Sequence, residues 1–234
     1  MKNLTTLVLL WLLALVPALA QTSPEVRSLA NFTAVEVGNG IELNLKAGQP
    51  QLVEASADTP EHLARLKTEV ENGVLKITFD RQLNEAWGKK NFVKNLRVNV
   101  TAAALTALSA SSGSQVLVAA PYAAEALQLK VSSGATVVAA FTATSLQASV
   151  SSGGVATVTG KIQRLEVTSS SGGDFKGADL QTTQCEASAS SGGSIAVAVQ
   201  ETLSAKASSG GGVRYSGSPA VTKNTSSGGS VRSL

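Results

Sequence analysis

The segment LEVTSSSGGDF, residues 165–175, decides the fold because its pattern returns along the second half of the chain. Ser-Ser-Gly stands at its centre, and this tripeptide occurs seven times. Its glycines are Gly113, Gly134, Gly153, Gly172, Gly192, Gly210 and Gly228. Successive glycines are 21, 19, 19, 20, 18 and 18 residues apart, which indicates a structural repeat and not a flexible Ser/Gly linker.

The residues before each repeat glycine alternate in polarity with a period of two. Positions are numbered from that glycine, so that Leu165 is at −7, Glu166 at −6 and Val167 at −5. Position −7 holds Leu127, Leu146, Leu165, Cys185, Leu203 and Val221 in the last six repeats. The alternation predicts a strand with one face in the core, repeated from coil to coil.

A second strand is predicted after each glycine. Position +3 holds Val116, Val137, Phe175, Ile195, Val213 and Val231, and in the third repeat Val155 at +2 is expected to take this place. Glycine permits a positive φ, so each repeat is predicted to form a strand, a Ser-Ser-Gly corner, a strand and a variable return. Stacked about 4.8 Å apart, such coils close a continuous core.

The sequence therefore predicts an all-β fold: a single-domain parallel β-helix, right-handed, of about seven Ser-Ser-Gly coils. The expected organisation is a signal peptide over 1–20, an N-terminal part of the β-helix over 21–101 and the repeat over 102–234. An antiparallel meander of hairpins would give a similar number of strands, but equal residues in the same phase once per coil favour stacking.

The region before the repeat is predicted to form irregular first coils and a cap of strands with one short helix. Strands are expected on both sides of Gly38-Asn39-Gly40 and near 51–56, and Asn72-Gly73 indicates a hairpin turn. A helix is expected from Asp58-Thr-Pro-Glu61 to about Leu66. The polar residues 80–94 are expected to form an exposed loop.

The first twenty residues predict export. Lys2 precedes an apolar run from Leu7 to Val16, and Ala18-Leu19-Ala20 is typical of a cleavage site, so the mature chain is expected to begin at Gln21. The run is too short for a membrane-spanning helix, which needs about 20 residues. We therefore expect a periplasmic, extracellular or cell-surface protein with no integral membrane segment in the mature chain.

Composition argues against several kinds of chemistry. Without Lys2, 18 basic and 16 acidic residues remain, with no basic cluster, so nucleic acid is not an expected partner. We find no pattern for catalytic, cofactor-binding or metal-binding residues. His62 is expected to be a surface histidine. Cys185, the only cysteine, shares position −7 with leucines and is predicted to be a buried structural residue.

One constellation supports an enzymatic alternative. Glu166 and Glu186 share position −6 in neighbouring coils, and stacking would place them about 4.8 Å apart. That spacing is close to the carboxyl separation of retaining glycosidases. Since Gln147 and Ser204 continue the same column, solvated glutamates are the favoured interpretation over a carbohydrate-active enzyme.

The chain resembles the auto-transporter adhesin head GIN domain family of exported bacterial proteins. The matching patterns are Phe32-x-x-Val35-x-Val37-x-x-Gly40-Ile41-x-Leu43, Asn72-Gly-x-Leu75-x-Ile77, the series of Ser-Ser-Gly corners and Tyr215-x-Gly217-x-Pro219. The resemblance implies a β-helical fold, an exported location and adhesion, and brings no catalytic motif.

Together these patterns predict an exported, non-enzymatic structural or binding module, adhesin-like, that acts through the polar face of a rigid rod. Its ligand is not specified by the sequence; an envelope glycan or protein is the expected kind of partner. Open solenoid ends would also allow oligomers.

Overall fold

A computed structural model describes residues 23–81 and 95–234. The predicted signal peptide of residues 1–20, the predicted start at Gln21 and most of the predicted loop over 80–94 lie outside the described residues.

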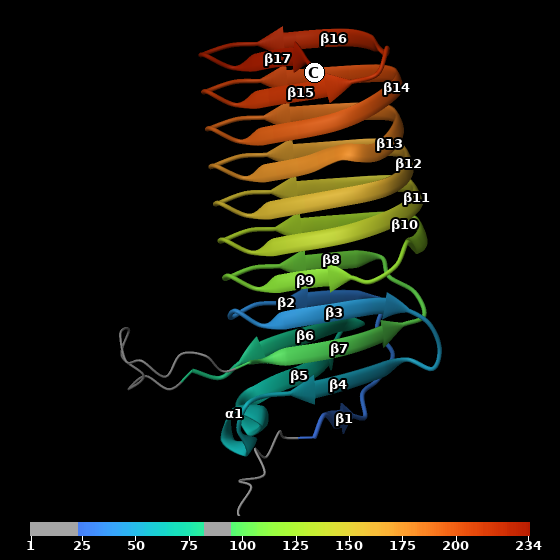
Figure 1. The fold of residues 1–234 in the computed structure, drawn as a ribbon, viewed down its shortest axis with the longest axis vertical. Coiled ribbons are helices and arrows are strands. Elements are labelled where there is room, and N and C mark those ends of the chain that lie inside the picture. The colour runs from blue at the N-terminus through green and yellow to red at the C-terminus, as the bar shows by residue number, and fades with distance from the viewer. Residues whose placement is uncertain (1–22, 82–94) are drawn as a thin grey trace, which may run out of the picture.

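The described residues form seventeen strands and one short helix. The part before the repeat consists of β1 (Glu25–Arg27), β2 (Ala34–Val37), β3 (Glu42–Ala47), β4 (Leu52–Ser56), α1 (Pro60–Arg65), β5 (Leu66–Glu71), β6 (Val74–Phe79) and β7 (Arg97–Ala102). The repeat consists of β8 (Ala107–Ala110), β9 (Gln115–Val118), β10 (Tyr122–Val131), β11 (Thr136–Val150), β12 (Val155–Ser169), β13 (Asp174–Ala189), β14 (Ser194–Ala207), β15 (Gly212–Ser216), β16 (Ala220–Thr225) and β17 (Ser230–Ser233). Figure 1 shows them stacked as a rod.

The repeat is a parallel β-solenoid with seven Ser-Ser-Gly coils, as predicted. Each strand from β10 to β13 pairs in parallel with the next, and equal repeat positions lie side by side: Leu127 faces Leu146, which faces Leu165, which faces Cys185. The antiparallel meander is excluded for the repeat, because β8 to β17 pair with one another only in parallel.

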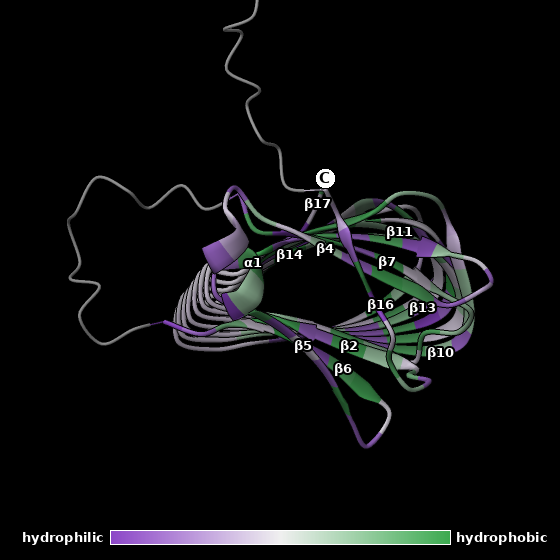
Figure 2. Cartoon of the chain, turned by 90° about the horizontal axis from the view of Figure 1, so that it is seen from below, coloured by the Kyte–Doolittle hydropathy of each residue, from purple (hydrophilic) through white to green (hydrophobic). Residues whose placement is uncertain are grey.

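Each coil has two faces joined by a tight turn at one edge and a bend at the other. The predicted variable return is this bend, and the strand continues through it, so that β11, β12 and β13 each contribute to both faces. In Figure 1 the near strands run toward the bends and the far strands run toward the turns while the coils rise to β17. The winding is right-handed, as predicted. Figure 2 shows the two faces along the rod axis.

The structure corrects one position in the third repeat. Ala156 at +3, and not Val155, lies in the column with Val137 and Phe175 and is fully buried, whereas Val155 is half-buried. The sequence prediction followed side-chain size and moved the strand by one residue. The register instead stays constant, and the small alanine lies directly beside the large ring of Phe175.

The first coils are stacked out of chain order. The coil of β2 and β3 pairs in parallel with β6 and β7 on one side and with β8 and β9 on the other. Its corner is Gly38-Asn39-Gly40, where Asn39 has a φ of 59° and Gly40 a φ of 72°. The repeat is thus built onto the coil that the chain forms first, with the later strands β6 and β7 below that coil.

Antiparallel strands and α1 cap the lower end of the rod. β5 pairs antiparallel with β6, β4 with β7 and β1 with β4. The predicted helix is present as Pro60–Arg65, with Thr59 as its N-cap. Because an unpaired strand edge recruits other chains, this covering protects the end of the solenoid. The predicted N-terminal cap is confirmed.

The Ser-Ser-Gly corners are tight turns with two left-handed residues each. In all seven, the second serine has a φ between 48° and 52° and the glycine a φ between 70° and 75°. In the turn of residues 170–173, the Gly173 amide donates to the Ser170 carbonyl at 2.9 Å, which completes a type I′ turn. In hairpins such turns connect two strands that pair with each other. Here each turn connects a strand on one face of the solenoid to a strand on the other face.

The residue after the corner glycine is the most restricted position of the turn. It is glycine in five repeats, and a β-carbon added to Gly173 would lie 2.5 Å from the carbonyl oxygen of Val150 in the coil below. By contrast, a β-carbon on Gly172 would meet nothing within 4 Å. Close approach between coils therefore requires Gly173, whereas backbone conformation favours Gly172.

Candidate functional site

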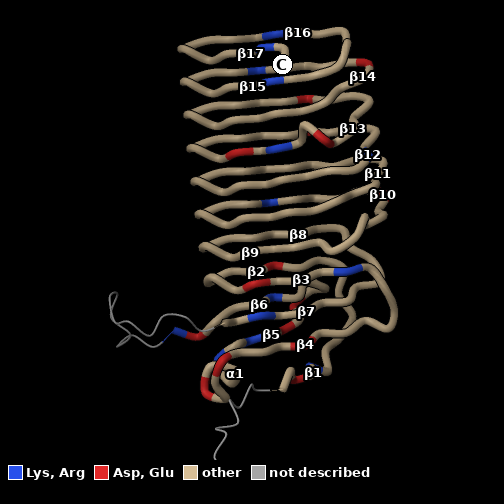
Figure 3. The backbone as a smooth tube through the Cα atoms, viewed as in Figure 1, with Lys and Arg blue, Asp and Glu red and all other residues tan. Residues whose placement is uncertain are grey.

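The outer surface of the repeat carries few charges. Residues 102–234 hold eight Lys or Arg and six Asp or Glu. Figure 3 marks charged residues more densely along the N-terminal strands and the cap. Most of the outward positions of the repeat therefore present neutral polar groups and small aliphatic side chains.

A shallow groove of about 860 Å³ runs along the rod across six coils, and Thr106 of the coil below them lines its lower end. We call it the axial groove and define it by three columns at positions −8, −7 and −6. Its floor is formed by Leu127, Leu146, Leu165, Cys185, Leu203 and Val221. One rim, at −6, is formed by Gln128, Gln147, Glu166, Glu186, Ser204 and Thr222. The other rim, at −8, is formed by Ala126, Ser145, Arg164, Gln184, Thr202 and Ala220.

Strand alternation explains this arrangement. The five floor residues from Leu127 to Leu203 are at most 3% exposed, because their side chains point into the core. The rim side chains point outward on both sides of them. The groove therefore has mostly polar side chains on its rims, over a closed apolar floor.

The structure brings Glu166 and Glu186 together on one rim, as the sequence predicted. The two residues are direct partners of β12 and β13 and both are exposed. Gln147, on the coil below, donates from Nε2 to Glu166 Oε2 at 3.3 Å. The carboxylates thus lie in an open column on the outer surface of the rod.

Cys185 lies in the groove floor but is not available to solvent. Its side chain is 3% exposed. Burial, with a smaller contribution from the charge of Glu186, raises the pKa of the thiol from 9.0 to about 12. A thiol that is buried and protonated is a poor nucleophile. The predicted structural role of Cys185 agrees with this position.

We expect native Cys185 to react with the thiol reagent DTNB at pH 8 at least about 100-fold more slowly than the guanidinium-unfolded chain, because reaction requires local opening. A Cys185→Val variant provides the background rate and should fold normally, since Val221 occupies the same column. Labelling of the native protein at the unfolded rate would contradict the assignment.

The raised pKa of the Cys185 thiol also makes the free energy of unfolding depend on pH. The raised pKa favours the protonated thiol in the folded chain, so the unfolded chain gains from ionisation above pH 9. The contribution of Cys185 to the free energy of unfolding is complete below about pH 9 and decreases as the pH rises toward about 12. Cys185→Val should lack this component in denaturant titrations.

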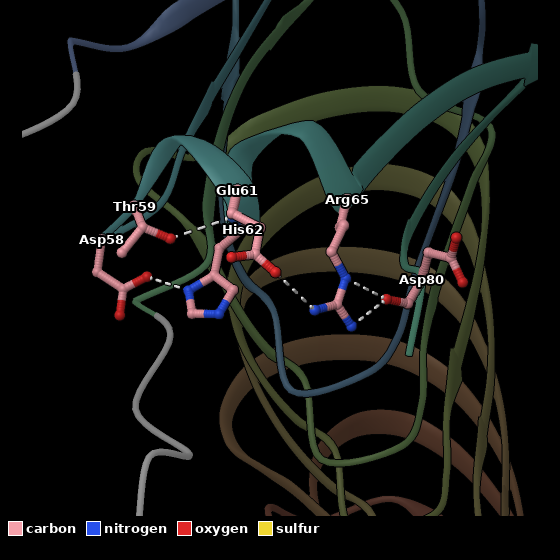
Figure 4. A network of polar contacts seen from close by, with 6 residues as sticks. All are labelled: Asp58, Thr59, Glu61, His62, Arg65 and Asp80. Atoms are coloured by element: carbon pink, nitrogen blue, oxygen red, sulfur yellow. Dashed lines mark hydrogen bonds and ion pairs between the residues drawn. The ribbon is translucent and has the colours of Figure 1, made fainter. Parts of the chain in front are cut away.

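His62 belongs to the cap of α1. Its Nδ1 lies 2.5 Å from Asp58 Oδ1, and its backbone amide donates to Thr59 Oγ1 at 3.2 Å (Figure 4). The sequence predicts a surface histidine and shows no partner for it, whereas in the structure it has a carboxylate partner one helical turn away. The contacts are those of a helix N-terminus, and His62 lies far along the chain from the axial groove.

Arg65 ties the same helix to the end of β6. Its Nε and Nη2 donate to the Asp80 carbonyl at 2.9 and 2.7 Å, and its guanidinium lies 4.7 Å from the centre of the Phe79 ring. Glu61 adds a long ion pair at 3.9 Å (Figure 4). This network fastens the helix to the coil of β6 and β7.

The described residues show neither a metal-binding group nor a membrane span. Within 23–81 and 95–234, no three His, Cys, Asp or Glu side chains are grouped so as to hold a metal ion. In the same ranges no helix is both long and apolar enough to cross a membrane.

With this geometry established, the family is clear. The family described as "Putative auto-transporter adhesin, head GIN domain" matches residues 31–219. The chain belongs to this family. No curated protein matches it. The resemblance noted from the sequence is thereby confirmed, and the matched range contains the whole axial groove except for its last residues.

Solved structures share the fold at low sequence identity. A protein from Bacteroides fragilis described as a "putative adhesin" is 16% identical with a TM-score of 0.79, over 91% of this chain and 96% of that chain. A second, from Parabacteroides distasonis, is 20% identical with a TM-score of 0.70 over 91% and 96%. A "putative lipid binding protein" from the same species is 17% identical with a TM-score of 0.62, over 91% and 97%.

Sequence reasoning found the carboxylate column but missed the groove. The −8 residues Arg164 and Gln184 received no role, because the alternation was followed only from −7 onward. The alternation indicates only that these two side chains are on the surface, since −8 must point outward when −7 points inward.

Proposed function

We propose that the protein is an exported, adhesin-like module that binds a partner at the cell envelope through the polar surface of its rod and catalyses no reaction. The observation that carries the proposal is the repetition itself. Each coil presents outward side chains at the same positions, in register with its neighbours, on a scaffold of continuous parallel strands. A ligand with repeating units can thus meet similar groups many times.

Family membership supports the adhesin-like role, and the leader-like residues 1–20 support export. Intact-mass analysis of the exported protein tests the second point, because removal of the signal peptide would leave a chain that begins at Gln21.

Binding without turnover is the expected result when the purified chain is titrated onto envelope preparations of the cells that produce it. Cosedimentation should be saturable, and soluble reducing sugar should not increase. Glycosidase-treated and protease-treated envelopes would distinguish a glycan from a protein partner. A release of sugar that disappears in Glu166→Gln would instead support the enzyme, and absence of saturable binding would contradict the proposal.

A further inference from the structure

The axial groove is a long, regular concavity on the rod. Its six coils follow one another about 4.8 Å apart, and the rims run parallel to the rod axis. A ligand that fills the groove must therefore be an extended chain that lies across the strands, with units about as long as one coil spacing.

The rims offer hydrogen-bonding groups of both kinds. Gln147 and Gln184 carry amides that donate and accept, Glu166 and Glu186 carry acceptors, and Arg164 donates. All five residues are exposed. Between the rims the backbone is already paired with the coils above and below. Only side chains are free to recognise a ligand in the groove.

These features argue against three kinds of chain. A peptide strand cannot add to the sheet here, because the amides and carbonyls beneath the groove are already used within the stack. An acyl chain finds little apolar surface on the floor, because Leu146 and Leu165 are 1% and 2% exposed. A polyanion is disfavoured, because Glu166 and Glu186 outnumber Arg164 among the described residues that line the groove.

We infer that the axial groove binds an extended, uncharged glycan chain that runs along the rod. The inference rests on the proposed function and names its ligand class. Sugar hydroxyls both donate and accept, and so match the amides, carboxylates and guanidinium of the rims. A pyranose unit in an extended glycan is similar in length to one coil spacing, so successive units meet successive coils.

Among the residues that the structure describes, none that lines the groove is an aromatic on which a sugar ring could stack. Affinity must therefore accumulate from hydrogen bonds made one coil at a time. This gives the inference a specific signature: affinity should increase with chain length until the ligand spans the groove, and then become constant.

The probes are cello-, chito- and manno-oligosaccharides of two to eight units, titrated into the purified chain by calorimetry. We expect at least one series to bind with an affinity that increases up to about six units, the six coils of the groove. Gln147→Ala combined with Gln184→Ala should lower the affinity for the longest ligand at least about tenfold, which corresponds to a loss of about 1.4 kcal/mol of binding free energy.

Gln115→Ala combined with Thr136→Ala is the matched control. These residues are direct partners on neighbouring coils of β9 and β11, in columns outside the groove. The control variant should bind like the unchanged protein. Equal weakening by both variants, or affinity independent of chain length, would place the site elsewhere and overturn the inference.

Two further outcomes separate the inference from the proposed function. If no oligosaccharide series binds but envelope preparations still bind saturably, the groove inference fails and the proposed function stands. If neither binds, both fail. A third outcome would show a lipid ligand and would also overturn the inference. In that case the protein binds phosphatidylcholine vesicles, and the Gln147→Ala, Gln184→Ala variant does not.

Discussion

Replacing Gly173 with alanine is expected to lower the melting temperature by about 6–12 °C. The added β-carbon would lie 2.5 Å from the Val150 carbonyl oxygen, a backbone atom that cannot rotate away. The coils must separate locally, and overpacking of this kind costs about 3 kcal/mol. For a chain of this size, each 1 kcal/mol corresponds to about 2–4 °C. Thermal unfolding followed by circular dichroism measures the difference.

Gly172→Ala is the matched control, one residue earlier in the same turn. Its β-carbon would meet nothing, so only the left-handed conformation at a φ of 71° is unfavourable, at a cost of about 1–2 kcal/mol. Gly229→Ala in the last coil should also be milder than Gly173→Ala, because only one coil can be displaced there. Equal losses at Gly172 and Gly173 would mean that contact between coils does not limit this position.

The repeat was predictable because every coil places its residues in the same structural environment, so the same pattern of apolar and polar positions recurs. The residues at −7, from Leu127 to Val221, remain apolar, and those at −6 remain polar. A single strand would leave its register open, but repeated copies fix both the phase and the parallel pairing. Structure and prediction therefore agree in column after column.

The order of the first coils could not be predicted in the same way. β2 and β3 lie between β6 and β7 on one side and β8 and β9 on the other. No repeated tripeptide marks these strands. Their partners are chosen by contacts between segments far apart in the chain, which local patterns do not contain.

The left-handed serines were missed for a different reason. Serine gives no strong preference for a positive φ, whereas asparagine does. The clue was the corner at Asn39-Gly40, which occupies the equivalent place one coil below the first Ser-Ser-Gly turn. Serine tolerates this conformation here because each turn is held by its neighbours; for example, the Gly172 amide donates to the Ser191 carbonyl at 3.3 Å.

The candidate site was only half predictable. Alternation placed Glu166 and Glu186 in one outward column, and their register was correct. Concavity arises from the bend between the two faces, and the sequence marks that bend by no fixed residue. The distance between the two rims depends on this curvature, so the groove could be recognised only in three dimensions.

The sequence predicted that Val155 would take the inward position that Ala156 occupies. The reason for this difference lies in the packing of Phe175, where the second large effect on stability is expected. Phe175 is fully buried, and Ala156 is its direct partner on the coil below. The ring also leans over its own strand, since a β-carbon on Gly177 would lie 2.6 Å from Phe175 Cε1. A large side chain thus takes space that its small neighbours leave, which explains why alanine stands next to Phe175 in a column that otherwise holds valines and one isoleucine.

Phe175→Ala should destabilise the protein by about 3–5 kcal/mol, because it opens a cavity in the middle of the stack. Ala156→Val should cost about 1–3 kcal/mol, because the added methyl groups meet the ring. Chemical unfolding in guanidinium measures both free energies. Phe175→Leu, which keeps most of the volume, serves as the control and should lose clearly less than Phe175→Ala.

The double variant Ala156→Val, Phe175→Ala tests whether the volumes of these two side chains compensate for each other. With alanine at 175, valine at 156 enters the vacated space, so the combined loss should be smaller than the sum of the two single losses by about 0.5–3 kcal/mol. Val155→Ala combined with Phe175→Ala should be additive, because residue 155 faces outward from a different column. If instead Val155 couples to Phe175 and Ala156 does not, residue 155 points inward and the register of the third coil is one residue away from the one described.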